Sequence, residues 1–222
     1  MRMRRPPYGL NFDLLSSLTF KTLNMKKTIQ AFLGLVILAT QACSSNSNDS
    51  VKQAKDANEK KDSNTTAYAD TNKVSSTTPV DKDAADFAVA AANGGMMEVA
   101  LGKYAQENGL NQRVKDFGAM MVKDHTKANE ALKTIAAQKN ITLPAEVGGD
   151  EKKHMDDMMK KKGKDFDKAY ISMMVDDHKK DVKEFEKAAK DSKDPDLKNF
   201  ASTTLPVLQT HLDSCKAIHD AQ

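Results

Sequence analysis

The sequence predicts an all-α protein, a four-helix bundle preceded by a signal segment and a disordered tether. Three observations lead to this prediction. From Asp81 onward, apolar residues recur with a period near 3.6 and β-branched runs are few, which favours long amphipathic helices. Four such stretches are joined by short first and third links and a long middle connection, an arrangement found in helix bundles. The segment that precedes them is poor in large apolar residues.

Residues 1–42 have the layout of a signal segment, with Met25 as the more plausible start of translation. A basic pair, Lys26 and Lys27, precedes an uncharged apolar stretch and then small residues before Cys43, which is the order of a secretory signal. The apolar stretch is shorter than the roughly 20 residues that a membrane-spanning helix needs. We therefore expect cleavage before Cys43 and lipidation of this cysteine. An ordinary cleaved signal and a cytoplasmic helix are the alternatives.

A lipid on Cys43 predicts a cell-envelope protein held to a membrane, in the outer membrane or the periplasm. Loss of residues 1–42 removes six of the 34 Lys and Arg and one of the 31 Asp and Glu, which leaves 28 basic against 30 acidic residues. No basic stripe remains for nucleic acid, and the sequence does not identify a protein partner. Acylation of Cys43 would leave Cys215 unpaired, which argues against a structural disulfide.

Residues 43–80 are expected to form the lipidated cysteine and a disordered tether. Residues 44–80 contain no Leu, Ile, Phe or Met and are rich in Ser, Asn, Thr, Asp and Lys. Such a segment buries too little apolar surface to offset the entropy lost on ordering. The folded domain is therefore expected to span residues 81–222.

Four long helices are predicted in this domain, at about Asp83–Asn108, Gln112–Lys139, Asp165–Ser192 and Pro195–Asp220. Asp83, Asn111 and Asp194 are the expected N-caps, because their side chains accept from the first free backbone N–H groups. Gly109 is the expected C-terminal stop of the first helix. The connection between the second and third long helices is expected to hold a short helix at Glu151–Lys161.

An internal similarity relates the two halves of the domain. Met120-Met121-Val122-Lys123-Asp124-His125 returns 53 residues later as Met173-Met174-Val175-Asp176-Asp177-His178. The two halves are consistent with descent from one helical hairpin.

The order and spacing of several short runs resemble a bacterial family of unknown function that is assigned to the outer membrane and has a ferritin-like fold. The runs are Gly94–Val99, Met121–His125, Tyr170–Ile171 with Asp177–His178, and Leu205–Pro206 with His211–Leu212. The resemblance covers about Asp83 to Ala217. It implies a ferritin-like four-helix bundle and an envelope location, and it implies no established activity.

Each predicted long helix carries one strong metal-ligand type of residue near the middle of its apolar face. These residues are Glu98, His125, His178 and His211. Helices of similar length packed side by side would bring the four midpoints to a similar height. A carboxylate and three imidazoles in an apolar core are costly unless they are paired or bound to something. One transition-metal ion, Zn, Cu or Fe, would satisfy them.

The ferritin-type di-iron pattern is not matched, because none of the four long helices carries Glu-x-x-His and only one glutamate faces the core. A mononuclear, histidine-rich site is the metal hypothesis, with Asp124 and Asp177, each next to a histidine, as supporting groups. The competing hypothesis is a buried hydrogen-bond network that fixes the register of the helices.

The sequence shows no nucleophile triad, phosphate-binding loop or haem-attachment motif, so no catalytic residue is predicted. The first functional hypothesis is a non-enzymatic, membrane-tethered domain that acts in envelope maintenance or stress tolerance. The alternative is a metal-binding or oxidoreductase-like bundle with its site in the histidine-rich core.

Overall fold

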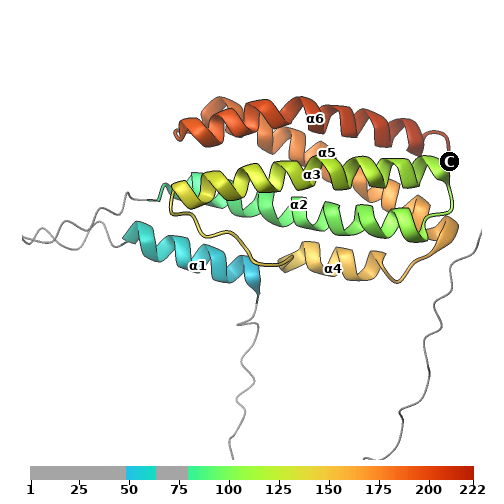
Figure 1. The fold of residues 1–222 in the computed structure, drawn as a ribbon, viewed down its shortest axis with the longest axis horizontal. Coiled ribbons are helices and arrows are strands. Elements are labelled where there is room, and N and C mark those ends of the chain that lie inside the picture. Colours follow the sequence, from blue (N-terminus) through green and yellow to red (C-terminus); the bar gives the residue numbers. More distant parts are fainter. Residues whose placement is uncertain (1–48, 64–79) are drawn as a thin grey trace, which may run out of the picture. The chain divides into compact units, whose positions relative to one another are not determined.

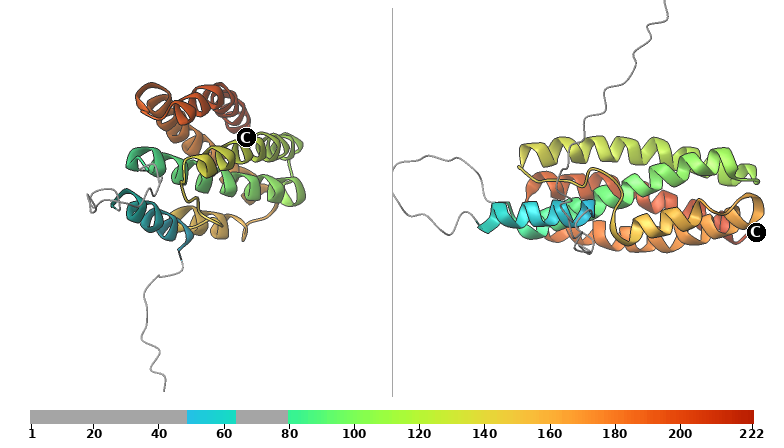
Figure 2. Two further views of the ribbon diagram at one scale, coloured as in Figure 1. Left: turned by 60° about the vertical axis from the view of Figure 1, so that its left-hand side comes forward. Right: turned by 90° about the horizontal axis from the view of Figure 1, so that it is seen from below.

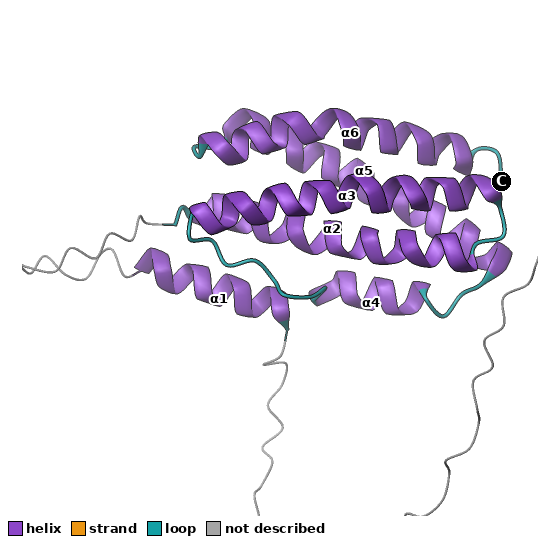
Figure 3. Ribbon diagram, in the orientation of Figure 1, coloured by secondary structure: helices purple, strands orange, loops and turns teal. Residues whose placement is uncertain are grey.

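The computed structural model describes residues 49–63 and 80–222, which form helices and no strand (Figures 1 and 3). The helices are α1 (Ser50–Ser63), α2 (Lys82–Asn108), α3 (Gln112–Gln138), α4 (Gly149–Met158), α5 (Gly163–Asp191) and α6 (Pro195–His219). The all-helical class predicted from the sequence is confirmed for these residues. The predicted signal segment 1–42 and Cys43 lie outside the described residues. No helix of the described part is long and apolar enough to cross a membrane.

The four long helices pack as two hairpins, α2 with α3 and α5 with α6, and we refer to them together as the bundle (Figures 1 and 2). Each hairpin is closed by a link of three residues, whereas residues 139–162 connect α3 to α5 and contain α4. Asp167 of α5 ties the first link, since its carboxylate accepts from the backbone N–H groups of Leu110 and Asn111 at 3.0 and 2.7 Å. The start of α3 is thus positioned directly on α5.

The ends of the long helices follow the capping residues. Asn111 caps α3 and Asp194 caps α6, and Gly109 ends α2, as predicted. The predicted cap Asp83 is wrong, because Asp81 accepts from the backbone N–H of Ala84 and α2 begins one residue after it. Asp83 lies instead in the first turn, where a negative charge faces the positive end of the helix dipole.

The apolar interior of the bundle is divided into two clusters along its length. One contains Leu101, Phe117 and Met174, and the other contains Leu132 and Phe185. The residues singled out from the sequence as metal-ligand types belong to neither cluster and are nevertheless buried. They form a polar layer between the two apolar clusters.

The α2–α3 hairpin is unusually tight at one crossing. A β-carbon added to Gly102 would lie 2.7 Å from the carbonyl oxygen of Gly118, and one added to Gly118 would lie 2.7 Å from the carbonyl oxygen of Gly102. Only glycine lets two helix backbones approach so closely. This crossing fixes the spacing of α2 and α3 one turn from Glu98 on α2 and two turns from His125 on α3.

The structure differs from the predicted disordered tether at residues 50–63, which form α1 along α2 (Figure 2). Asn58 both donates to the carbonyl oxygen of Thr142 and accepts from its N–H, at 2.9 and 2.7 Å. Ser50 accepts from the N–H of Ala145 at 2.8 Å, and Ala54 is buried. The prediction failed because it counted large apolar residues. Helix α1 docks instead through small and polar side chains, which pair with backbone groups of the connection between α3 and α4 that would otherwise lack hydrogen-bond partners.

Helix α4 is shifted toward the N-terminus relative to the predicted Glu151–Lys161. At its start, the side chain of Asn93 accepts from the N–H of Gly148 at 2.9 Å and donates to the carboxylate of Glu151 at 2.9 Å. Beyond its end, the hydroxyl of Tyr104 lies 2.7 Å from the carbonyl oxygen of Met159 and 2.9 Å from that of Lys161. Both anchors belong to α2, which therefore helps to hold both ends of α4.

Candidate metal centre

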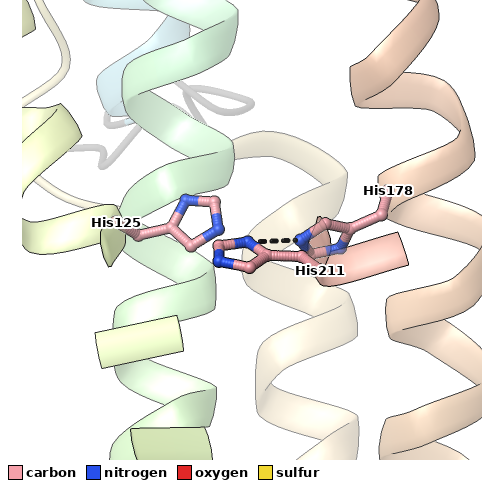
Figure 4. A group of neighbouring side chains, drawn as sticks. All are labelled: His125, His178 and His211. Atoms are coloured by element: carbon pink, nitrogen blue, oxygen red, sulfur yellow. Dashed lines mark hydrogen bonds between the residues drawn. The ribbon is translucent and has the colours of Figure 1, made fainter. Parts of the chain in front are cut away.

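The structure brings together the four residues that the sequence singled out. Glu98 lies on α2, His125 on α3, His178 on α5 and His211 on α6. Their exposed fractions are 2%, 6%, 0% and 1%. The imidazole rings point toward one another (Figure 4), with centroids 5.2 to 5.7 Å apart. Each helix of the bundle therefore contributes one buried polar side chain to one compact cluster.

Each histidine has one ring nitrogen against an acceptor. Nδ1 of His125 lies 2.9 Å from Oε2 of Glu98. Nδ1 of His178 lies 3.0 Å from the carbonyl oxygen of Met174, one helical turn earlier. Nε2 of His211 lies 3.1 Å from Oδ2 of Asp124. Since a carboxylate or a carbonyl oxygen only accepts, each of these nitrogens has to carry the ring proton.

The other three nitrogens are then unprotonated in the neutral imidazoles. Nε2 of His178 and Nδ1 of His211 face each other at 3.3 Å. Two lone pairs meet there, because both protons are already used on the outer acceptors. Nε2 of His125 is buried and has no hydrogen-bond partner, and neither has Oε1 of Glu98, which lies 3.6 Å from Nε2 of His178. A hydrogen-bond network alone does not satisfy this cluster.

Electrostatics keep two of the imidazoles neutral. Burial, followed by repulsion from His125, lowers the pKa of His211 to about 4. Burial also lowers the pKa of His178. An extra proton between these two rings would complete the network, but neither ring holds one at neutral pH. His125 differs, because the carboxylate of Glu98 outweighs burial and raises its pKa.

The carboxyl group of Glu98 is held ionised by its surroundings. Burial alone would raise its pKa, but the attraction of His125 and His178 outweighs the burial and lowers the pKa. Glu98 therefore presents a negative oxygen, Oε1, to the centre of the cluster while Oε2 orients His125.

The unprotonated nitrogens are arranged like metal ligands. The ligand atoms of His125, His178 and His211 all lie within 4.8 Å of one another. A tetrahedral ion with metal–nitrogen distances of about 2.0–2.1 Å has nitrogen–nitrogen edges of about 3.3–3.4 Å. The 3.3 Å separation between His178 and His211 matches such an edge. In addition, metal-binding histidines donate their second N–H to a carboxylate or a backbone carbonyl, as all three do here.

The two aspartates that were expected to support the site have different positions. Asp124 of α3 contacts His211 of α6 and not the ring of its sequence neighbour His125. Its side chain is 26% exposed. Asp177 makes no hydrogen bond with the three site histidines, and its Oδ2 is buried without a partner. The structure thus places one predicted supporting group against the site and leaves the other beside it.

Two further groups near the site were missed by the sequence analysis. Asp181 forms a second group with Glu98 and His178, with ligand atoms within 4.8 Å of one another. Burial, with Glu98 and Asp177 nearby, raises the pKa of Asp181 well above its usual value. Its signal in the sequence was the spacing His178-x-x-Asp181, which puts both side chains on one helix face. Tyr170 is fully buried, and its hydroxyl has no partner.

Replacing Asp177 by asparagine is expected to stabilise the protein at neutral pH. Burial, followed by the charge of Glu98, raises the pKa of Asp177 to about 6 from 3.8. The folded state therefore holds this proton more tightly than the unfolded state, and the resulting stability is lost as the pH rises through 6. After allowance for partial exposure, the gain in free energy of unfolding at pH 8 is about 1–2 kcal/mol.

Denaturant unfolding at pH 4 and pH 8 measures this effect. Asp177→Asn should lie close to the wild type at pH 4, where the folded protein holds Asp177 uncharged, and exceed it at pH 8. Asp176→Asn, at the exposed neighbouring position, is the control and should show no such change with pH. An equal gain at both pH values would contradict the assigned shift in pKa.

Comparisons with known proteins give one result. A family model described as domain of unknown function (DUF4142) matches residues 69–218. The match includes the bundle and α4 and begins after α1. No curated protein and no solved structure matches the chain.

Proposed function

Starting from the fact that the chain belongs to the DUF4142 family of unknown function, we propose that its bundle binds one transition-metal ion. His125 Nε2, His178 Nε2 and His211 Nδ1 are the ligands, and Glu98 supplies either a fourth ligand, Oε1, or the group that orients His125. Zn, Cu and Fe all accept imidazole nitrogen.

One observation carries this proposal. The three outer acceptors each take one ring proton, and this turns the second nitrogen of each histidine inward in a buried layer, as a lone pair in the neutral rings of His178 and His211. Burying unpaired polar groups costs free energy. A cation relieves this cost at all three nitrogens at once, whereas a proton relieves it at only one contact. The same arrangement supports the view that the polar layer has a function beyond fixing the register of the helices.

The experiment is metal loading of the full-length protein. After equilibration with Zn(II) or Cu(II) and removal of free metal, elemental analysis should give close to one ion per chain. The matched control replaces the exposed histidines, His154→Ala with His219→Ala, and should retain the ion. If the wild type retains no ion, or if the control loses it, the metal proposal fails. A wild type without an ion would favour the non-enzymatic scaffold predicted first from the sequence.

The fold supports a related proposal, that the bundle is ferritin-like. Two antiparallel hairpins joined by a long connection, with ligand-type side chains projecting inward from all four helices, occur in that class. An experimental structure in which the connection from α3 to α5 does not run along the length of the bundle would contradict it.

We further propose that the protein is anchored to a membrane of the cell envelope through a lipid on Cys43. The order of basic, apolar and small residues before this cysteine supports the proposal. Cys43→Ser is expected to move the protein from the membrane fraction to the soluble envelope fraction without changing its folding, since Cys43 is outside the bundle. Mass spectrometry of the N-terminal peptide checks it. An unmodified, soluble wild-type protein would show that the anchor is absent.

A further inference from the structure

A small cavity lies against the candidate metal centre, on the side of the second apolar cluster, which contains Leu132 and Phe185. Its volume is about 30 Å³. Glu98 and His125 line it, together with residues from all four helices of the bundle. The cavity therefore offers a space directly beside the proposed ion.

The wall of the cavity is made by small side chains on α2. Ala90, Ala91, Gly94 and Gly95 all line it. A β-carbon added to Gly94 would meet no atom within 4 Å, whereas one added to Gly95 would lie 2.3 Å from the side chain of Asn129. Gly95 is thus explained by close packing of α2 on α3. Gly94 is not, and its missing side chain keeps the cavity open one turn before Glu98.

Two unsatisfied buried atoms belong to residues of the cavity wall. Oε1 of Glu98 and Nε2 of His125 have no hydrogen-bond partner, and both side chains are more than nine-tenths buried. An ion held by three histidines, with Glu98 orienting His125, keeps a fourth coordination position for another ligand. The cavity adjoins two of the groups that surround the ion, so it is the space from which that position can be reached.

We propose that this cavity admits a neutral molecule of about two non-hydrogen atoms, such as dioxygen or nitric oxide, to the ion. This inference rests on the proposed metal site and names the class of ligand that the site takes. A cavity needs roughly 10–15 Å³ to hold one water, so the observed 30 Å³ has room for about two such atoms. Organic ligands occupy pockets of about 300–1,000 Å³ and do not fit.

The charge of the wall favours a neutral ligand over an anion. Besides Glu98, the carboxyl groups of Asp181 and Glu184 line the cavity, and no lysine or arginine does. The opposite wall is apolar, with Phe185, Phe200 and Leu208. An anion would lose its hydration against carboxyl groups and apolar rings, whereas a neutral diatomic molecule has little hydration to lose.

The test uses the full-length protein loaded anaerobically with Fe(II) and titrated with nitric oxide, followed by EPR of the iron–nitrosyl species. The wild type should bind nitric oxide. Gly94→Leu places an isobutyl group in the cavity and should retain its iron while its affinity for nitric oxide falls at least about tenfold, equal to ~1.4 kcal/mol. The control is Ala100→Leu, at a half-buried position of the same helix that is outside the cavity wall, and it should behave like the wild type.

The outcomes separate the two proposals. A wild type that holds neither Fe(II) nor, in the loading experiment, Zn(II) or Cu(II) would refute the metal site itself, and the ligand inference with it. A wild type that holds Zn(II) or Cu(II) but no iron would refute the ligand inference alone. A wild type that holds iron but gives no nitrosyl signal, or a Gly94→Leu variant that holds iron and binds nitric oxide with unchanged affinity, would refute the inference alone. If Gly94→Leu loses its iron, Gly94→Ala replaces it, because its β-carbon meets no atom within 4 Å. This smaller change should also weaken nitric oxide binding, and unchanged affinity would overturn the inference.

Discussion

The double variant His125→Ala with His178→Ala is expected to retain no metal ion. These two residues supply two of the three inward nitrogens, and His211 alone cannot hold an ion against water. The variant should also lose the stabilisation that the wild type gains from the ion. At a free-ion concentration of 100 times the dissociation constant, that gain is about 2.7 kcal/mol in the free energy of unfolding. Elemental analysis and thermal unfolding with and without a chelator measure both effects.

The chelator separates loss of metal from loss of packing. In the wild type it should lower the melting temperature toward that of the metal-free protein, whereas in the double variant it should have no effect. A register-fixing network predicts another pattern: no chelator effect in either protein, and a cost of roughly 1–3 kcal/mol for each unpaired partner. A double variant that retains one ion per chain would show that the ion lies elsewhere.

Gly118→Leu is expected to cause the largest loss of stability of any single change considered. Its β-carbon would lie 2.7 Å from the carbonyl oxygen of Gly102 and 2.9 Å from the β-carbon of Ala105. Backbone atoms cannot turn aside as a side chain does, so α2 and α3 have to separate. Overpacking of a core costs about 1–3 kcal/mol and sometimes more, and we expect the upper end of this range.

The separation should also reach the metal site. Glu98 lies on α2 and His125 on α3, and their 2.9 Å contact depends on the spacing of the two helices. Denaturant unfolding and a competitive metal titration measure stability and affinity in the same protein. Gly94→Ala is the matched control on α2, because its β-carbon meets no atom within 4 Å. It should leave stability unchanged or raise it by up to about 1 kcal/mol, since glycine disfavours helix. Equal stability of the two variants would contradict the assigned role of the close crossing.

The helices of the bundle could be predicted because their signals are local. Asn111 and Asp194 cap helices through groups two or three residues away, and Gly109 ends α2 next to Asn108. Helix α1 could not be predicted, because the groups that hold it are far away in the sequence. Asn58 of α1 pairs with the backbone of Thr142, 84 residues later.

The candidate site shows the same division. Helical periodicity placed Glu98 and the three histidines inward, and the structure brings their side chains together. Periodicity could not tell which aspartate meets a histidine, since Asp124 contacts His211 of another helix. The tautomers also could not be predicted, because the carbonyl oxygen of Met174 that fixes His178 is a backbone group. The cavity beside Gly94 depends on the fit of all four helices and has no signal in the sequence.

The most direct test of the metal proposal is the position of a bound ion in a crystal of the metal-loaded full-length protein, located by anomalous scattering at the absorption edge of that metal. The proposal predicts one peak in the polar layer, about 2.0–2.2 Å from Nε2 of His125, Nε2 of His178 and Nδ1 of His211. A polar layer without a peak, or a peak confined to exposed residues such as His154 and His219, would contradict it.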